Sequence, residues 1–466
     1  MTQPRILILS SSLLTERMFL HSSFGRTIAG QAQVHLWTTS ATNLEGVSGG
    51  TAGIEITPFP AVRPFREYPY NYLRRFNEYV WDFRLQPPSR LSMMRNVRDL
   101  EHRRRVLALK GPARLLAALH AERLTEAWLE RLLLTCDRSP EGLARLRQLR
   151  PDLLVTTGTF RYEEPAIVAA ARRLGIPVLA QITSWDNPST KNRMVFRYDG
   201  YLVWSEQMKR DIEHFYPESR RVPVYLTGAP QFDVFFDQRF AQERAAFCRE
   251  QRLDPQRPIV LYAMGSPNLF QEVEAIRYLG ESIARLELGD VQLLVRPHPI
   301  HDDGRDLDPL RQLGPRVVLQ ETPQRGQRVA HRAQDEEQIG QWVNTFRHAA
   351  VVVNLSSTAA IDGAIFDKPV VNLDFDPAPG QPRQQLVHDL NHVWTHFKPI
   401  AESGGMWMVS NPAEMVEAVR GYLAHPEWHR EKRRGIAELV CGRIDGESGA
   451  RLAMAILDFA AQVKQV

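Results

Sequence analysis

VVVNLSSTAAIDGAIFDKPVVNLDFD, residues 351–376, joins two short apolar runs through a polar turn and a helical stretch. The runs VVV and PVVNL have the length and β-branched composition of strands that are buried on both faces of a sheet. Small hydroxyl residues follow the first run, and the apolar spacing of AAIDGAIF then predicts a short helix. The stretch therefore predicts a strand, a helix and a second strand that lies parallel to the first.

The same alternation of apolar runs and helical stretches covers most of the chain. The predicted strands are RILILS, QVHLW, DLLVTTG, PVLAQIT, GYLVWS and VPVYLTG before residue 230, and PIVLYAMGS, VQLLVRPHP, PRVVLQE, AAVVVNLSS, KPVVNLD and MWMVS after Asp254. Such alternation is typical of parallel βαβ units. Because 466 residues exceed what one hydrophobic core usually supports, we expect an α/β protein with two doubly wound, Rossmann-like parallel-sheet domains.

The expected domain boundaries lie where this pattern changes. The first domain is expected over residues 1–235, with an Arg-rich helical insertion at about 61–150 that interrupts the strands. The second domain is expected over residues 236–445, and residues 446–466 are expected to form a C-terminal helix. That helix could cover the second domain or cross back to pack on the first.

Composition excludes several classes of protein. Hydrophobic residues make up 43% and charged residues 24%, which is typical of a globular chain. The net charge of +4 is too small for a dedicated nucleic-acid binder, so we expect no nucleic-acid partner. Three distant cysteines indicate neither a disulfide framework nor a zinc site and fit a reducing cytoplasm. The first apolar run is too short for a signal peptide, and no run approaches the ~18 to 20 apolar residues of a membrane span.

One segment has a strong local charge asymmetry. Residues 61–110 contain 12 basic and 5 acidic residues, interleaved with aromatic residues in FREYPYNYLRRFNEYVWDF. A basic, aromatic helical segment suits peripheral contact with an anionic membrane, here at its inner face. The alternative is a solvated helical face without a partner.

The hydroxyl-rich turn of the opening stretch is a candidate anion site. Ligands of open parallel sheets bind outside the carboxyl ends of the strands. Ser356, Ser357 and Thr358 follow such an end and precede a helix, whose free N–H groups and dipole favour phosphate. Asp362 lies about one turn into that helix, facing either the ligand or solvent. The alternative is an ordinary capped helix that binds nothing.

Two further loops of the second half suit the same ligand. Arg296 and His298, in RPHP, can donate charge-assisted hydrogen bonds to a diphosphate. Gly265 and Ser266, in AMGS, allow close approach of a ligand to the backbone, unless both loops are simple turns. No GxGxxG follows the first strand and no GxxxxGK[ST] occurs, so neither a dehydrogenase nor a P-loop ATPase is indicated. Together the loops predict a site for a nucleotide diphosphate.

Candidate bases come from the first half. Asp186, in TSWDNPSTK, could accept a proton from an acceptor hydroxyl while Trp185 stacks on a sugar or lipid, and the alternative is a local turn. Glu163 and Glu164 are further candidates, whose alternative is capping of the following helix. His21 is a weaker candidate, because an isolated helical histidine is more often structural.

No metal site is predicted. HDD at 301–303 and DFD at 374–376 lack the convergent acidic spacing of a magnesium site. We therefore expect metal-independent chemistry, in which Arg296, His298 and the helix N-terminus stabilise a leaving diphosphate.

The motifs also resemble a known architecture. Two doubly wound domains with RPHP followed by NLSSTAAIDGAIFDKPVVNLD resemble the GT-B glycosyltransferases. SWDNPSTK, LVWSEQMKRDI and LTGAPQFD are similar to segments of the CDP-glycerol glycerophosphotransferase and surface-polysaccharide biosynthesis group, so the likeness covers about residues 152–449. The resemblance implies a cleft with the donor in the C-terminal half and the acceptor in the N-terminal half. It implies contacts with donor phosphates for His298, Ser356, Ser357 and Thr358.

The sequence departs from that group in one respect. The glycerophosphotransferases use a histidine in their N-terminal half, and its motif has no match here, which favours sugar transfer. The expected function is a metal-independent glycosyltransferase without a tightly bound cofactor. It would move a sugar from a nucleotide diphosphate sugar to a hydroxyl of a glycan or lipid-linked acceptor in bacterial surface polysaccharide or glycolipid biosynthesis. The alternatives are a CDP-glycerol-type polyol-phosphate transferase, a sugar-nucleotide 2-epimerase and a non-catalytic nucleotide-sugar-binding scaffold. The DSGG-type loop that is characteristic of the epimerases is absent, since NLSST occupies its place.

Overall fold

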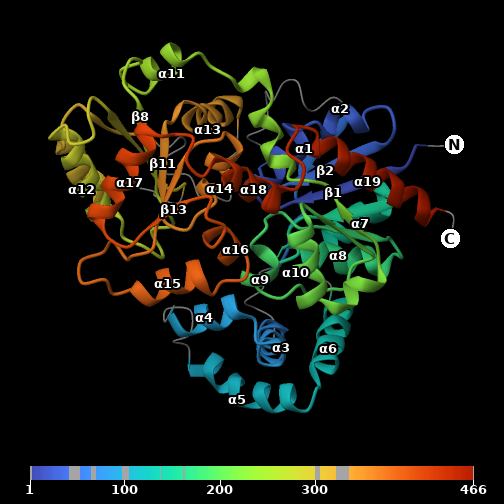
Figure 1. The fold of residues 1–466 in the computed structure, drawn as a ribbon. Coiled ribbons are helices and arrows are strands. Elements are labelled where there is room, and N and C mark those ends of the chain that lie inside the picture. Colours follow the sequence, from blue (N-terminus) through green and yellow to red (C-terminus); the bar gives the residue numbers. More distant parts are fainter. Residues whose placement is uncertain are drawn as a thin grey trace. The chain divides into compact units, whose positions relative to one another are not determined.

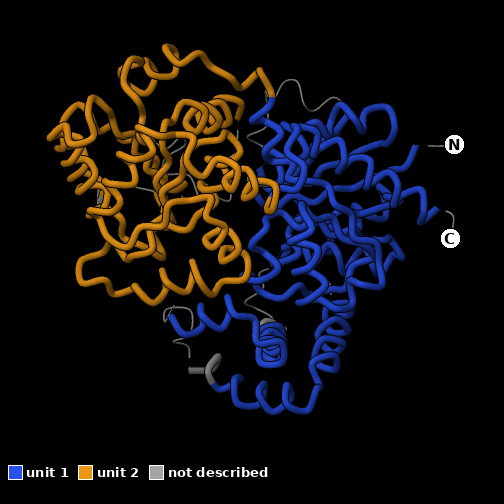
Figure 2. The backbone as a smooth tube through the Cα atoms, in the orientation of Figure 1, with its two compact units in different colours: residues 1–236, 330–333, 441–466 blue, residues 237–329, 334–440 orange. Residues whose placement is uncertain are grey.

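The computed structural model describes residues 3–40, 53–63, 70–96, 104–136, 138–160, 163–299, 305–321 and 335–464. These residues form two compact units, shown in two colours in Figure 2. Unit 1 contains the described part of residues 1–236 together with the C-terminal stretch that begins at Cys441. Unit 2 contains the described residues between Asp237 and Val440.

Unit 1 is built on a sheet in which seven described strands pair in parallel, in the order β3-β2-β1-β4-β5-β6-β7. The strands are β1 (Arg5–Ser10), β2 (Gln33–Thr38), β3 (Ile54–Pro58), β4 (Leu153–Thr156), β5 (Val178–Gln181), β6 (Gly200–Val203) and β7 (Val224–Leu226). Six of them confirm the strands predicted in this half of the chain. The seventh strand, β3, was not predicted, because this edge strand is only partly buried and has no continuous apolar run.

The centre of this sheet is apolar on both faces. In the parallel register, Ile8 of β1 lies between Leu36 of β2 and Val155 of β4, and all three side chains are fully buried. Burial on both faces explains why β1, β4 and β5 are continuous apolar runs rather than alternating ones.

The helices of unit 1 fall into those that cover the sheet and those inserted between β3 and β4 (Figure 1). The first group comprises α1 (Leu13–Leu20), α2 (Phe24–Ile28), α8 (Glu164–Arg173), α9 (Asn187–Thr190), α10 (Glu206–Phe215), η4 (Pro217–Arg221), η5 (Pro230–Phe235) and α19 (Ser448–Val463). The second group comprises α3 (Tyr70–Leu85), α4 (Pro88–Asn96), α5 (Arg104–Ala118), α6 (Glu122–Thr135) and α7 (Pro140–Leu149).

The inserted helices have an apolar core of their own. Tyr79 and Val80 of α3 pack with Ala113 and Ala117 of α5, and Phe83 is partly buried against them. The aromatic residues of this part of the chain therefore mostly stabilise helix packing, since aromatic side chains bury large apolar areas.

Buried ion pairs connect the insertion with the sheet-covering part of unit 1. Arg193, in the loop after α9, donates from Nη2 to Glu126 of α6 at 3.0 Å, and both side chains are 5% exposed. The guanidinium also lies over the rings of Trp81 and Tyr216, 3.6 and 4.6 Å from their centroids. Stacking and pairing together offset the cost of burying the two charges.

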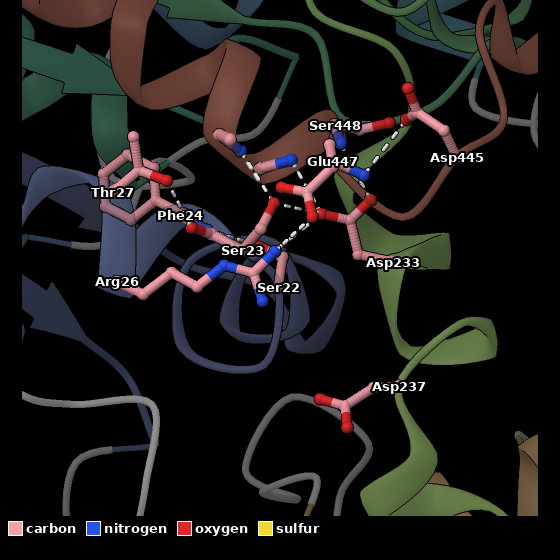
Figure 3. A network of polar contacts seen from close by, with 12 residues as sticks. Ser22, Ser23, Phe24, Arg26, Thr27, Asp233, Asp237, Asp445, Glu447 and Ser448 are labelled. Carbon is pink, nitrogen blue, oxygen red and sulfur yellow. Dashed lines mark hydrogen bonds and ion pairs between the residues drawn. The ribbon is translucent and has the colours of Figure 1, made fainter.

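The C-terminal helix α19 packs on unit 1 through a buried carboxylate (Figure 3). Asp233, in η5, accepts hydrogen bonds from the backbone N–H groups of Ser448 and Gly449 at 3.0 and 2.8 Å. It also accepts from the hydroxyl of Ser23 at 2.8 Å, and that hydroxyl oxygen accepts from the N–H of Ala450. Three of the unpaired N–H groups at the start of α19 are thus satisfied, and the negative charge lies at the positive end of the helix dipole.

Unit 2 is built on a second sheet, in which six described strands pair in parallel in the order β10-β9-β8-β11-β12-β13. The strands are β8 (Ile259–Ala263), β9 (Gln292–Arg296), β10 (Val317–Leu319), β11 (Val351–Asn354), β12 (Val370–Leu373) and β13 (Trp407–Val409). All six confirm the strands predicted in this half, and the two strands of the opening stretch pair directly as β11 and β12.

The helical elements of unit 2 alternate with these strands. They are η6 (Gln238–Phe240), α11 (Arg244–Glu250), α12 (Val273–Ala284), η7 (Arg305–Gln312), α13 (Glu336–His348), α14 (Ala359–Ile365), α15 (Gln384–His392), α16 (Lys398–Ala401), α17 (Pro412–Ala424) and α18 (Arg430–Cys441). The predicted class of two doubly wound α/β domains is confirmed. Within the described ranges, no helix combines the length and the apolar character needed to cross a bilayer.

Candidate functional site

The three candidate loops of unit 2 follow neighbouring strands. β8 lies between β9 and β11, so the strand order reverses at β8, and ligands of such sheets bind at this position. The backbone N–H of Met264, after β8, donates to the carbonyl of Arg296 at 3.0 Å. A Cβ atom placed on Gly265 would lie 3.7 Å from the carbonyl oxygen of Leu355, after β11. The structure thus brings AMGS, RPHP and NLSST together at one edge of the sheet.

Arg296 ends β9 and is half-buried at this edge. Its Nη1 donates to Gln320 at 2.9 Å. Burial lowers the pKa of Arg296 to about 10, against the opposing effect of the nearby Asp362 carboxylate, so the guanidinium keeps its charge at neutral pH. Asp362 itself is 7% exposed and accepts from the indole N–H of Trp342 at 3.4 Å. Of the two orientations expected for Asp362, the one toward solvent is therefore wrong.

His298 lies two residues beyond β9 and is half-buried.

Gly265 is held by a carboxylate that was not predicted from the sequence. Glu272, just before α12, is 1% exposed and accepts from the N–H of Gly265 at 2.7 Å and from the hydroxyl of Tyr262 at 3.2 Å. Burial raises the pKa of Glu272 to about 7, partly opposed by these two hydrogen bonds. Ser266 begins a turn, since its carbonyl accepts from two backbone N–H groups.

The hydroxyl loop after β11 is held by asparagines. Ser356 has a φ of 44°, a conformation that is uncommon outside glycine. Its N–H donates to Asn372 at 2.9 Å and its hydroxyl donates to Asn391 at 2.8 Å. Ser357 is engaged in the same way, because its N–H donates to Asn354 at 3.0 Å. Strained residues that several side chains fix in place are concentrated at functional sites, which supports a role for this loop.

Of the three hydroxyl residues expected to cap this helix, Ser357 accepts a hydrogen bond from its first turn. Thr358 is the N-cap residue of α14, but its side chain makes no capping hydrogen bond and is exposed. The hydroxyl of Ser357 instead accepts from the N–H of Ala359 at 3.2 Å. Since α14 has only seven residues, its dipole contributes less to anion binding than the sequence analysis expected.

In unit 1 the strand order reverses between β1 and β4. Glu164 hydrogen-bonds to the loops that follow both of these strands. Its carboxylate is fully buried and accepts from the N–H and the hydroxyl of Ser11, after β1, at 3.0 and 2.6 Å. It also accepts from the N–H groups of Thr157 and Gly158, after β4, at 2.8 and 2.7 Å. With these bonds Glu164 fixes two loops and is not available as a base.

The other candidate residues of unit 1 differ in exposure. Asp186 accepts from the hydroxyls of Ser184 and Thr190, and Lys191 lies 3.7 Å from its carboxylate. Trp185 is 3% exposed, so the expected stacking of this ring on a sugar or lipid is wrong.

Glu163 is exposed and precedes α8, whose N-terminus it does not cap through its side chain. His21, the C-cap residue of α1, is 2% exposed, as expected for a structural histidine.

One group of side chains in unit 2 has the composition of a metal site. Asp374, the first residue of DFD, lies beside His388 and His392 of α15, with one potential ligand atom from each residue within 4.8 Å of the others. The sequence analysis considered DFD only as an acidic motif, and the spacing of two histidines in HDLNH was the signal that it missed. HDD at 301–303 lies outside the described residues.

Comparison with known proteins identifies the architecture. No model of a protein family matches the chain, and no curated protein matches it. Solved structures do match over nearly the whole chain. The UDP-GlcNAc 2-epimerase of Neisseria meningitidis bound to UDP-GlcNAc has a TM-score of 0.53 at 13% identity, covering 97% of this chain and 100% of the other.

Two other solved structures are similar to the same extent. A glycosyltransferase from Rickettsia africae has a TM-score of 0.52 at 10% identity, covering 99% of this chain and 100% of the other. UGT73P12 of Glycyrrhiza uralensis, complexed with glycyrrhetinic acid 3-O-monoglucuronide, has a TM-score of 0.52 at 13% identity, covering 100% and 97%. The chain has the GT-B fold. At these identities the similarity establishes the architecture of two Rossmann-like units and nothing finer.

Proposed function

We propose that this protein is a glycosyltransferase that moves a sugar from a nucleotide diphosphate sugar to a hydroxyl group of a glycan or lipid-linked acceptor. The observation that carries the proposal is the convergence of three loops where the strand order of unit 2 reverses. The guanidinium of Arg296, the imidazole of His298 and the backbone at Gly265 thus lie at the same end of the sheet. Together these groups suit a diphosphate.

The donor site comprises the loops after β8, β9 and β11. Its proposed members are Gly265, Ser266, Arg296, His298, Ser356, Ser357, Thr358 and Asp362. Arg296 and His298 supply positive charge or hydrogen-bond donors, and the exposed hydroxyl of Thr358 supplies another donor. Asp362 acts through Arg296, whose guanidinium it helps to keep charged. No tightly bound cofactor is needed for this chemistry.

The proposed reaction breaks the bond between the anomeric carbon of the sugar and a phosphate oxygen. The electron pair stays on the leaving nucleoside diphosphate, where Arg296 and His298 stabilise the developing charge. The acceptor oxygen forms the new bond to the anomeric carbon and loses its proton to a base.

We assign that base to unit 1, with Glu163 and Asp186 as the two candidates. Glu163 is the better candidate because it is the more exposed of the two and therefore more accessible to an acceptor.

A uridine diphosphate sugar is the donor class that we infer, because the similar Neisseria enzyme was solved with UDP-GlcNAc. A panel of UDP-, GDP-, CDP- and dTDP-sugars, scored by the rise in melting temperature, tests this choice without knowledge of the acceptor. The largest rise is expected with UDP-sugars. A larger rise with CDP-glycerol would instead favour a polyol-phosphate transferase, for which the similar structures give no support.

Turnover of the donor tests the role of His298. The variant His298→Ala should release nucleoside diphosphate about 100-fold more slowly than the wild type, because one stabilising group at the leaving diphosphate is lost. His425→Ala, which changes a half-exposed histidine elsewhere in unit 2, should keep full activity. Activity of His298→Ala equal to that of the wild type would exclude the assignment. Donor binding without turnover by any acceptor would indicate a scaffold protein.

A 2-epimerase is the second candidate, since UDP-GlcNAc 2-epimerases are among the similar structures. NMR of the sugar distinguishes the two activities. An epimerase converts UDP-GlcNAc to its C2 epimer without an acceptor, whereas a glycosyltransferase leaves the sugar unchanged until an acceptor is added.

We propose further that the protein works in the cytoplasm and binds the inner face of an anionic membrane through α5. This helix has four basic residues, Arg104, Arg105, Lys110 and Arg114, and no acidic residue. Leu115 of α5 and Leu119, the first residue after its end, lie four residues apart and are 62% and 65% exposed. Exposed leucines on a basic helix suit contact with acidic lipids, and co-sedimentation with vesicles measures such contact. The aromatic residues of 61–110 contribute less than the sequence analysis expected, because Tyr79 and Trp81 are buried.

A further inference from the structure

We propose that Asp374, His388 and His392 form a binding site for a divalent transition-metal cation such as Zn²⁺. The site is confined to unit 2 and does not depend on the proposed function. Asp374 follows directly after β12, and the two histidines lie four residues apart on α15. Residues with this spacing lie on the same side of a helix, so the two imidazoles are neighbours.

The three side chains place their potential ligand atoms close together. Nε2 of His392 lies 2.8 Å from Oδ2 of Asp374. The rings of His388 and His392 have centroids 4.7 Å apart. One ligand atom from each of the three residues lies within 4.8 Å of the others, and the longest separation involves His388. Ligand atoms lie about 2.0 to 2.2 Å from a zinc ion and therefore about 3.3 Å from one another in a tetrahedral site. Binding would replace the hydrogen bond between His392 and Asp374 by two bonds to the cation and draw in the exposed His388 ring.

Neighbouring residues fix the carboxylate. Nδ2 of Asn391 donates to Oδ1 of Asp374 at 2.9 Å, which leaves Oδ2 directed at His392. The side chain of Gln384, the first residue of α15, donates to the carbonyl of Asp374 at 3.3 Å and so ties the start of the helix to the end of the strand. Orientation of a carboxylate ligand by a second hydrogen bond is a regular feature of metal sites.

The ligand set determines the class of cation. Two imidazole nitrogens and one carboxylate oxygen favour Zn²⁺, Co²⁺, Ni²⁺ or Cu²⁺ over Mg²⁺ and Ca²⁺, which prefer sites built from oxygen alone. Three protein ligands leave further coordination positions for water, as in open zinc sites. Asn391 also accepts from the hydroxyl of Ser356, so the cation site and the hydroxyl loop share one side chain.

The experiment is titration of the full chain, without a polyhistidine tag, with Zn²⁺ at pH 7.5 in an isothermal calorimeter. Co²⁺ is titrated in parallel and followed by its visible absorption, whose intensity reports the coordination number and geometry of the bound ion. The wild type should bind one equivalent of Zn²⁺ at this site, with higher affinity than at any other site on the protein. His388→Ala and Asp374→Asn should each weaken this binding at least about tenfold.

His388→Ala is the decisive variant because its side chain is exposed, so the fold should not depend on it. His425→Ala is the matched control, since His425 is also an exposed histidine of unit 2 beside a carboxylate, that of Glu427, but forms no group of three ligands among the described residues. It should bind Zn²⁺ as the wild type does. Equal Zn²⁺ affinity of His388→Ala and the wild type, or no saturable binding by the wild type, would overturn the proposal and leave only a His392–Asp374 ion pair. Because nucleotide is absent from the assay, its outcome is independent of the donor proposal.

Discussion

At the scale of single residues, buried carboxylates organise the loops at the sheet edges. Glu272 in unit 2 holds the N–H of Gly265, and Glu164 in unit 1 holds the N–H groups of Ser11, Thr157 and Gly158. Each carboxylate sits beside the strand at which the strand order of its sheet reverses. A buried acceptor satisfies backbone donors that the turning chain leaves unpaired, so these loops keep one conformation.

Glu272 should make the stability of the protein depend on pH. Its pKa is about 7 in the folded protein and 4.5 when unperturbed, so the folded state binds the proton more tightly. The contribution of Glu272 to stability is therefore greatest below pH 4.5, falls as the pH rises toward 7 and is constant above it. The fall should amount to about 3 kcal/mol.

Urea unfolding of the wild type and Glu272→Gln between pH 5 and 8 measures this effect. The difference in free energy of unfolding between the two proteins should shift in favour of the variant as the pH rises. Glu274→Gln, which changes an exposed residue in the first turn of α12, should follow the wild type at every pH. A pH-independent difference between Glu272→Gln and the wild type would contradict the prediction.

At the scale of elements, the placement of α19 depends on few polar contacts and a long apolar face. Leu452, Ile456 and Phe459 are buried, at spacings of three and four residues that predict this face from the sequence. Gly449 lies where α19 approaches α2, and a Cβ atom there would come within 2.5 Å of the N–H nitrogen of Phe24. The close approach requires a residue without a side chain at this position.

Asp233→Ala should loosen the start of α19. The change leaves the N–H groups of Ser448 and Gly449 without their acceptor in a buried place, at a cost of about 2 to 4 kcal/mol in the free energy of unfolding of unit 1. Faster hydrogen exchange of the first-turn amides of α19 should accompany the loss. Glu447→Ala, which removes an exposed ion pair with Arg26, should cost less than about 1 kcal/mol. Equal effects of the two variants would show that Asp233 does not anchor the helix.

At the scale of the whole molecule, the chain leaves unit 1 after Phe236, forms unit 2 and returns to unit 1 at Cys441. Each unit has its own parallel sheet and its own core. The helical insertion of unit 1 has a separate small core, and it exposes Leu115 of α5 and Leu119 after it. In the function proposed above, unit 2 would bind the donor and the insertion would contact the membrane.

Binding to anionic vesicles is the prediction for the whole molecule. The wild type should co-sediment with vesicles of acidic phospholipid and less with neutral vesicles, and added salt should weaken the binding. The double variant Leu115→Ser/Leu119→Ser should lower the partition coefficient by about tenfold or more, because the apolar contact is lost. Leu286→Ser, which changes a leucine of unit 2 that is 54% exposed, is the control and should bind normally. No difference between acidic and neutral vesicles would contradict membrane contact through α5.

The sequence by itself determined the twelve strands that it predicted and the parallel α/β class, because strands buried on both faces need continuous apolar runs that are visible in one dimension. It also indicated which loops follow the carboxyl ends of these strands, but not the order of the strands in the sheet. Only the tertiary structure decided which polar side chains meet. Glu272 with Gly265, Asp233 with Ser448, and Asp374 with His388 are separated in the chain, and their contacts depend on how the elements pack. Polar pairs of this kind have no periodicity, so the sequence does not show which residues meet; the spacing of the two histidines in HDLNH indicates only that these two are neighbours.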